Sequence, residues 1–169
     1  MKKILFTIFT LFLFNAAFSQ EIIKIEFTKD KELLINSLIL SKLTTISELN
    51  KILGEPTIYK FYRSGKINYH FKEKGITVQT FDNKLIFIGL NFNWDGDATF
   101  PQTSYTGTFN IADLYVDKNS SNSIIENIKV VEIKCILPTL CMSDPKKEST
   151  PIIIGFKNDL VTQIGFQFH

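Results

Sequence analysis

The chain has 169 residues, of which 44% are hydrophobic and 21% are charged. It is long enough and apolar enough for one ordinary globular domain or two very small ones, which excludes an intrinsically disordered chain. Of its 19 Lys and Arg residues, Lys2 and Lys3 lie in a segment that we expect to be removed, which leaves 17 cations against 17 Asp and Glu residues. A neutral chain with one arginine, Arg63, disfavours nucleic acid and anionic membranes as partners.

Residues 1–19 are typical of a secretory signal peptide. Lys2 and Lys3 precede an apolar run from Ile4 to Phe14, and Ser19 is a small residue at the expected cleavage site before Gln20. The run is shorter than the roughly 18 apolar residues that a membrane span needs. We therefore expect a protein exported to the periplasm or beyond the cell, with no membrane insertion after cleavage.

The first half, residues 20–95, predicts strands around a single helix. Residues 22–27 and 33–40 are rich in β-branched and aliphatic residues, which favours strands. Thr45 and Glu48 form a capping box, and Gly54 and Pro56 follow the last apolar helical position, which predicts a helix between them. Two hairpins are expected next, one with strands 58–63 and 66–71 and one with strands 76–81 and 85–94.

The second half, residues 96–169, predicts the same order of elements in a degenerate form. Ser123 and Glu126 give a second capping box, and residues 127–137, 152–156 and 160–168 favour strands. Residues 142–151 predict a solvated loop. Together the patterns indicate an α+β fold, an antiparallel sheet with one short helix per half.

A shift of 76 residues aligns the chain with itself. Apolar and hydroxyl residues of 33–52 then fall on residues of the same kind in 109–128. Each half closes on F-x-N-x-L followed by I-G-x-x-F, in 81–92 and 156–168, with a gap of one residue between the two stretches of similarity. We predict two tandem halves packed as one compact domain; the alternative is chance similarity between apolar strands.

The stretch Thr44–Pro56, with a capped helix followed by G-x-P and a strand, carries a family resemblance. It resembles the small repeats of the beta-lactamase inhibitory protein and of the outer-membrane assembly lipoproteins (SmpA/BamE type), and it equally resembles exported families of unassigned function. The inhibitor resemblance implies a helix packed on an antiparallel sheet, and a protein that acts by binding another protein.

The two cysteines, Cys135 and Cys141, are expected to form a structural disulfide. An exported chain reaches an oxidising compartment, and the intervening Leu-Pro-Thr can turn the chain so that the thiols meet. Two buried free thiols are the alternative. A redox role is disfavoured because C-x-x-C spacing is missing.

No cofactor or metal site is predicted. Oxygen-bearing side chains at 91, 93, 95 and 97 with glycine at 96 have calcium-loop spacing, but Asn91 and Gln102 stand where charged ligands are needed. A strand that runs into an Asp-Gly turn is the favoured interpretation. His70 and His169 are too far apart in sequence to complete a zinc site with the cysteines.

Strand alternation supplies the candidate binding residues. It places Tyr59, Phe61, Ile67, Tyr69 and Phe71 toward the core, and Lys60, Tyr62, Asn68 and His70 on the opposite, wet face. Tyr62 and His70 are therefore candidates for recognition, and Trp94 is a second anchor. The alternative is an ordinary polar sheet face with His70 in solvent.

Catalytic signatures are missing from the sequence: it has no G-x-S-x-G, no glycine-rich phosphate loop and no H-E-x-x-H. We therefore expect a non-enzymatic exported module that binds another protein through a sheet face, as an inhibitor, an immunity-type protein or an envelope adaptor. The alternatives are a small exported hydrolase with a site between the halves, and a structural envelope protein.

Overall fold

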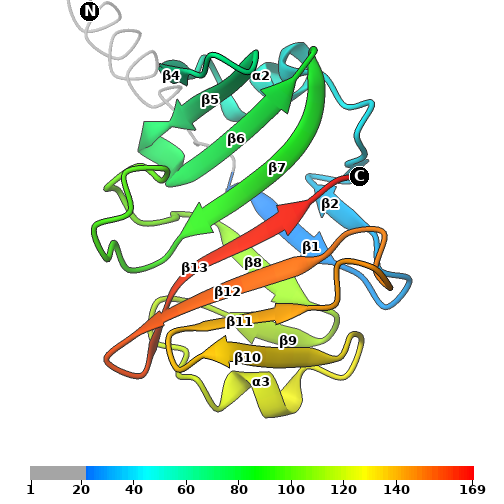
Figure 1. Cartoon of the computed structure of the whole chain (residues 1–169), viewed down its shortest axis with the longest axis vertical. Helices are drawn as coiled ribbons and strands as arrows, with labels where there is room; N and C mark the ends of the chain where they lie inside the picture. Colours follow the sequence, from blue (N-terminus) through cyan, green and yellow to red (C-terminus); the bar gives the residue numbers. More distant parts are fainter. Residues whose placement is uncertain (1–21) are drawn as a thin grey trace, which may run out of the picture.

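The computed structural model describes residues 22–169, so the predicted signal peptide, 1–19, lies outside the described residues. Within 22–169, no helix has the length and apolar character needed to cross a membrane. The described chain forms two packed β-sheets with two short α-helices, which confirms the predicted α+β class (Figure 1).

The smaller sheet has five short strands in the order β3-β2-β1-β8-β9. Their bounds are β1 Lys24–Phe27, β2 Leu33–Ile35, β3 Leu38–Ile39, β8 Thr108–Ile111 and β9 Leu114–Val116. Strands β1 and β8 pair in parallel, and the other pairs are antiparallel. The stretch 33–40 is therefore two strands, because Asn36 and Ser37 adopt positive φ angles of 44° and 71° and turn the chain between them.

The larger sheet has eight strands in the order β10-β11-β12-β13-β7-β6-β5-β4. The first half supplies β4 Thr57–Phe61, β5 Lys66–Phe71, β6 Ile76–Phe81 and β7 Lys84–Asn91. The second half supplies β10 Ile133–Leu137, β11 Leu140–Ser143, β12 Ile152–Lys157 and β13 Leu160–Gln167. The two four-stranded meanders meet where β7 and β13 pair antiparallel at the middle of the sheet (Figure 1).

Helix α2, Ile46–Leu53, begins at the predicted capping box. The Glu48 N–H donates to the Thr45 hydroxyl at 3.3 Å, and the Thr45 N–H donates to the Glu48 carboxylate at 2.8 Å. The helix buries Leu49 and Leu53 and ends at Gly54, whose φ of 85° favours glycine. The predicted helix is confirmed.

Helix α3, Ile124–Asn127, has no side-chain cap, so the predicted second capping box is wrong. Ser123 already has helical φ and ψ angles of −60° and −14°, which prevents the usual N-cap geometry. Its hydroxyl pairs instead with the Ser121 hydroxyl at 2.7 Å.

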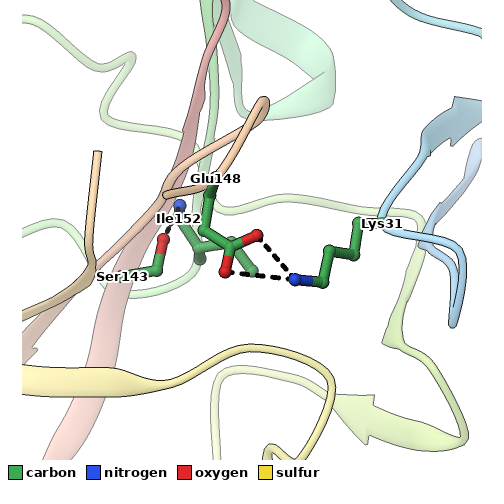
Figure 2. A network of polar contacts seen from close by, with 4 residues as sticks. All are labelled: Lys31, Ser143, Glu148 and Ile152. Atoms are coloured by element: carbon green, nitrogen blue, oxygen red, sulfur yellow. Dashed lines mark hydrogen bonds and ion pairs between the residues drawn. The ribbon is translucent and has the colours of Figure 1, made fainter. Parts of the chain in front are cut away.

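The second half differs from prediction in its strands as well. The predicted strand 127–137 is confined to β10, and β11 includes Met142 and Ser143, which we expected to lie in a solvated loop. Ser143 is fully buried, and its hydroxyl accepts from the Ile152 N–H at 2.9 Å. Glu148, between β11 and β12, accepts two hydrogen bonds from the Lys31 ammonium, at 2.9 and 3.2 Å (Figure 2). This ion pair ties the connection between β11 and β12 to the turn between β1 and β2 of the smaller sheet.

The core lies between the two sheets. Phe166 of β13 is fully buried, and its ring centroid lies 5.5 Å from that of Phe27 and 5.9 Å from that of Phe109, both in the smaller sheet. We call this side of the larger sheet its core face and the opposite side its outer face. On β5 and β6, alternation places Asn68, His70 and Thr77 on the outer face.

Elements of the two halves begin 76 residues apart at several places. The paired bounds are β4 and β10 at 57 and 133, β6 and β12 at 76 and 152, and β7 and β13 at 84 and 160. Both central hairpins turn on two residues with positive φ, Asp82-Asn83 and Asn158-Asp159. The spacing is not kept everywhere, since β5 and β11 begin 74 residues apart, at 66 and 140. The repeat of the two halves stays a prediction.

Candidate binding groove on the outer sheet face

The segment 92–107 connects β7 to β8 and crosses the outer face of the first meander. Three side chains of the sheet converge on one carbonyl of this segment, that of Thr99. It accepts hydrogen bonds from Asn68 Nδ2 at 3.1 Å, from His70 Nε2 at 2.9 Å and from Thr77 Oγ1 at 2.9 Å. The segment is therefore held on β5 and β6 by polar groups, of which alternation had placed Asn68 and His70 in solvent.

Asn91 fastens the next part of the same segment. Its amide nitrogen lies 2.9, 3.3 and 3.0 Å from the carbonyl oxygens of Pro101, Gln102 and Thr103, and the residue is fully buried. Buried carbonyls need such donors, because each one left without a partner costs free energy.

The residues with calcium-loop spacing therefore hold the chain in place. Asn93 Nδ2 donates to the carbonyls of Lys118 and Val161 at 2.7 and 2.8 Å. The carboxylates of Asp95 and Asp97 accept backbone N–H groups of the loop, at 3.0 and 2.7 Å. Within 22–169, no three His, Cys, Asp or Glu side chains cluster as metal ligands would.

The segment 92–107 builds one wall of a pocket of about 360 Å³, which we call the outer-face groove. Residues of β4, β5 and the following turn form the other wall. The groove is lined by Tyr59, His70, Lys72, Trp94, Ala98, Phe100, Pro101, Gln102 and Thr103.

Tyr59 reaches the groove because β4 contains a bulge. Ile58 pairs with Tyr69 and Lys60 pairs with Asn68, which leaves Tyr59 as the extra residue between them. The Tyr59 ring stacks on the His70 ring, with centroids 4.3 Å apart and planes 5° from parallel. The predicted core position of Tyr59 is therefore wrong, and the ring is 45% exposed.

The other predicted core positions on this hairpin are partly corrected. Phe71 is buried, as predicted, but Phe61 is 66% exposed because β4 is the edge strand and has no neighbour on its far side. Every residue of β4 is exposed.

His70 is buried, with 3% of its surface exposed, so its predicted solvent position is wrong. The Tyr59 ring and the segment 92–107 cover it. Since a carbonyl oxygen can only accept, Nε2 carries the hydrogen that is donated to Thr99. Burial lowers the pKa of His70 from its ordinary value; the Thr99 hydrogen bond opposes this effect and the Lys72 charge adds to it.

Trp94 forms the opposite side of the groove. Its side chain is 42% exposed, and its indole N–H donates to the Asp97 carbonyl at 3.3 Å. The structure therefore brings together two of the three predicted binding residues, His70 and Trp94, and adds Tyr59. Sequence reasoning missed Tyr59 because no local pattern marks the bulge that turns its ring over.

Tyr62 does not line the groove. It lies three residues after Tyr59, just beyond the end of β4, and two ammonium groups sit over its ring. Lys60 Nζ lies 4.8 Å from the ring centroid and Lys66 Nζ lies 4.3 Å from it. Tyr62 therefore positions cations beside the groove, an arrangement favoured by the negative face of the aromatic ring.

Cys135 and Cys141 form a disulfide, so the predicted pairing is confirmed. The two residues are direct cross-strand partners in the β10–β11 hairpin. This hairpin is at the edge of the large sheet opposite β4, so the disulfide does not contribute to the groove.

The family model of the domain of unknown function DUF7738 matches residues 24–126, more than half of the chain. The match runs from β1 into α3 and includes Tyr59, His70 and Trp94. No curated protein and no solved structure matches the chain. The resemblance to the beta-lactamase inhibitory protein and the assembly lipoproteins is not confirmed.

Proposed function

The chain belongs to the family of the domain of unknown function DUF7738, and we propose that this member is an exported module that binds another protein through its outer-face groove. The single observation that carries the proposal is the convergence of Tyr59 and Trp94. Two half-exposed aromatic rings, one from an edge strand and one from a distant connection, flank the same pocket.

Such rings are the usual anchors of protein interfaces. Aromatic side chains are enriched at interface cores, because each buries a large apolar area while losing little conformational entropy. The buried groups beneath them are already paired: the Thr99 carbonyl holds Asn68, His70 and Thr77. The floor of the groove is therefore preorganised, which reduces the cost of ordering it on binding.

A binding role fits the groove better than a catalytic one. His70 is the one histidine there, and its Nε2 hydrogen is engaged by a backbone carbonyl. The two nearby carboxylates, Asp95 and Asp97, are engaged by backbone N–H groups of their own loop. His70 Nε2 and these two carboxylates therefore already serve to hold the segment 92–107.

Export is supported by the disulfide, because paired cysteines persist in oxidising compartments. The predicted signal peptide, which lies in a different part of the chain, also indicates export. The expected partner is therefore an envelope or secreted protein.

Affinity capture with matched variants tests the proposal. The purified chain serves as bait for envelope and secreted fractions of the cells that express it, beside the variants Tyr59→Ala and Trp94→Ala. We expect one stoichiometric partner whose retention falls about 30-fold in each variant, the effect of losing roughly 2 kcal/mol at an interface anchor.

Tyr115→Ala is the matched control, because Tyr115 is 55% exposed but lies on β9 of the other sheet. It should leave capture unchanged. A partner that is retained equally by all three variants would place the interface elsewhere and overturn the proposal, as would the absence of any stoichiometric partner.

A further inference from the structure

We infer that the partner presents an acidic, extended segment to this chain, with one apolar side chain in the outer-face groove and carboxylates on the lysines beside it. The inference rests on the proposed function and names the chemistry of the partner. It comes from the charges around β4, which the near balance of 19 Lys and Arg against 17 Asp and Glu in the whole chain conceals.

The stretch 57–74, which forms β4, β5 and the following turn, is strongly basic. It contains five cations and one carboxylate, Glu73; the cations are Lys60, Arg63, Lys66, Lys72 and Lys74. Every ion pair found within 22–169 involves other residues. These five charges therefore have no acidic partner in the described chain, and Lys60, Arg63 and Lys72 are exposed.

Two of these charges are held in defined positions. The ammonium groups of Lys60 and Lys66 both sit over the Tyr62 ring, at 4.8 and 4.3 Å from its centroid. A lysine at a solvated surface normally loses rotamer entropy when it pairs with a carboxylate. Because the Tyr62 ring already orders both side chains, less entropy remains to be lost when an acidic group arrives.

The groove and the two lysines at Tyr62 lie next to each other along β4. Tyr59, which flanks the groove, and Tyr62, which carries the lysines, are three residues apart, or roughly 10 Å at about 3.3 Å per residue. Lys72 lines the groove itself. A ligand that contacts both features is therefore long and narrow, with an apolar group at one point and negative charge on either side of it.

The β4 backbone is a poor template for an added strand, although it forms a free edge. The bulge at Tyr59 interrupts its ladder, and Lys60 projects beside it. Bulges and edge lysines are features that prevent strands from adding to a sheet. Side-chain contacts, rather than a ninth strand, therefore carry the recognition, and the groove selects the apolar residue.

An acidic protein segment fits better than a nucleic acid. Four of the five cations are lysines, and the single arginine offers one site for the bidentate pairing that phosphates favour. With 19 Lys and Arg against 17 Asp and Glu, the whole chain also lacks the strong positive charge that gives nucleic-acid binding its long-range attraction. A local cluster of lysine ammonium groups is sufficient to bind the carboxylates of a protein segment.

Fluorescence titration tests the inference, since Trp94 is the one tryptophan of the chain and lies in the groove. The probe is a tryptophan-free peptide of alternating Glu and Ser with one central Phe. Two matched peptides replace every Glu by Lys, or the Phe by Gly. A thymidine oligonucleotide is the fourth probe.

The acidic Phe peptide is expected to shift Trp94 emission and to bind at least about tenfold more tightly than either matched peptide. Binding should weaken at least about tenfold between about 50 and about 500 mM salt, because exposed charges are screened. The double variant Lys60→Glu/Lys66→Glu should lose at least about tenfold in affinity. Lys146→Glu, an exposed change in the second half, should have no effect.

Equal binding of the acidic and basic peptides, or no dependence on salt, would overturn the inference. Tighter binding of the oligonucleotide would overturn it in favour of nucleic acid. If no peptide binds while Tyr59→Ala and Trp94→Ala still abolish capture of the natural partner, the acidic inference fails and the proposed function survives.

Discussion

The two halves of the large sheet share a layout but differ in what covers their outer faces. Over the first meander, the segment 92–107 is bound by Asn68, His70, Thr77 and Asn91. At the positions 76 residues later, Ile153 corresponds to Thr77 and has no polar side-chain group, and Gln167 corresponds to Asn91 and makes no side-chain hydrogen bond within residues 22–169. The segment also reaches the second meander, where Gln163 of β13 donates to the Asp95 carboxylate at 3.0 Å. The two meanders therefore differ in how many polar side chains hold this segment.

The strongest test of this difference lies at the centre of the large sheet, where β7 and β13 pair. Gly89 and Gly165 face each other where the meanders meet. A Cβ on Gly89 would lie 2.5 Å from Phe100 and 2.8 Å from Phe87, whereas the three atoms nearest to a Cβ on Gly165 all belong to Phe87, the first at 2.4 Å.

We expect Gly89→Ala to destabilise the fold by about 3 kcal/mol and Gly165→Ala by about 1–2 kcal/mol, since overpacking a tight site costs this much. Urea unfolding measures both values. Phe100→Ala should relieve the first change more than the second, because it removes one of the two rings at Gly89, whereas at Gly165 it only gives Phe87, which packs edge-on against Phe100, more room to move. Equal relief of both would show that the covering segment does not distinguish the halves.

Asn91→Ala should cost about 2.5 kcal/mol, because the buried Pro101 carbonyl and the half-buried carbonyls of Gln102 and Thr103 lose the amide group that donates to them. The matched change Gln167→Ala should cost less than about 0.5 kcal/mol. Thermal unfolding measures the two, and Trp94 emission should shift to longer wavelength in the first variant alone. Similar losses in the two variants would remove the distinction between the outer faces.

The two edge strands of the large sheet also differ, because a disulfide joins β10 to β11 and β4 has no such cross-link. Replacing both Cys135 and Cys141 by alanine should cost about 2 kcal/mol through the entropy of the short closed loop. Trp94 emission should not change, because the disulfide is at the opposite edge from β4. A change in emission would show that the two edges are coupled.

The smallest effect is expected from His70. Its pKa is lower in the folded chain than in the unfolded chain, where the ordinary value is about 6.5. Between the two values the unfolded chain binds more protons, so stability is present above about pH 6.5 and is lost as the pH falls through the folded value.

The variant His70→Gln should show a flatter dependence of melting temperature on pH below about 6.5 than the natural chain. The difference between the two profiles isolates this residue from the carboxylates that titrate in the same range. Parallel profiles would mean that the histidine is not shielded by Tyr59 and the segment 92–107.

Local signals in the sequence located much of the fold. The capping box at Thr45 and Glu48 marked α2, and alternation along β5 separated Asn68 and His70 from Phe71. The same alternation failed at Tyr59, because the bulge of β4 puts an extra residue there and no residue type marks it, whereas Lys60 and Phe61 pair with Asn68 and Ile67 on the predicted faces. Alternation also predicted that Asn68 and His70 face solvent, because the segment that covers them lies about thirty residues further along the chain.

The groove was predictable only in part for the same reason. The sequence identified His70 as a polar residue on the predicted wet face and Trp94 as an aromatic anchor. Their proximity depends on the path of the segment 92–107 across the outer face, which no local pattern predicts. The oxygen-rich stretch 91–97 was noticed for calcium, whereas its side chains serve to fix backbone groups. Spacing alone does not distinguish a metal ligand from a residue that fastens a loop.

Photo-crosslinking in the cells that express the chain tests the central claim most directly. A photoreactive phenylalanine analogue is placed singly at Tyr59, at Trp94 and, as controls, at Tyr115 and Ile136, which are exposed elsewhere. The account predicts one crosslinked partner, shared by positions 59 and 94 and missing at 115 and 136. Crosslinks confined to 115 or 136 would contradict it.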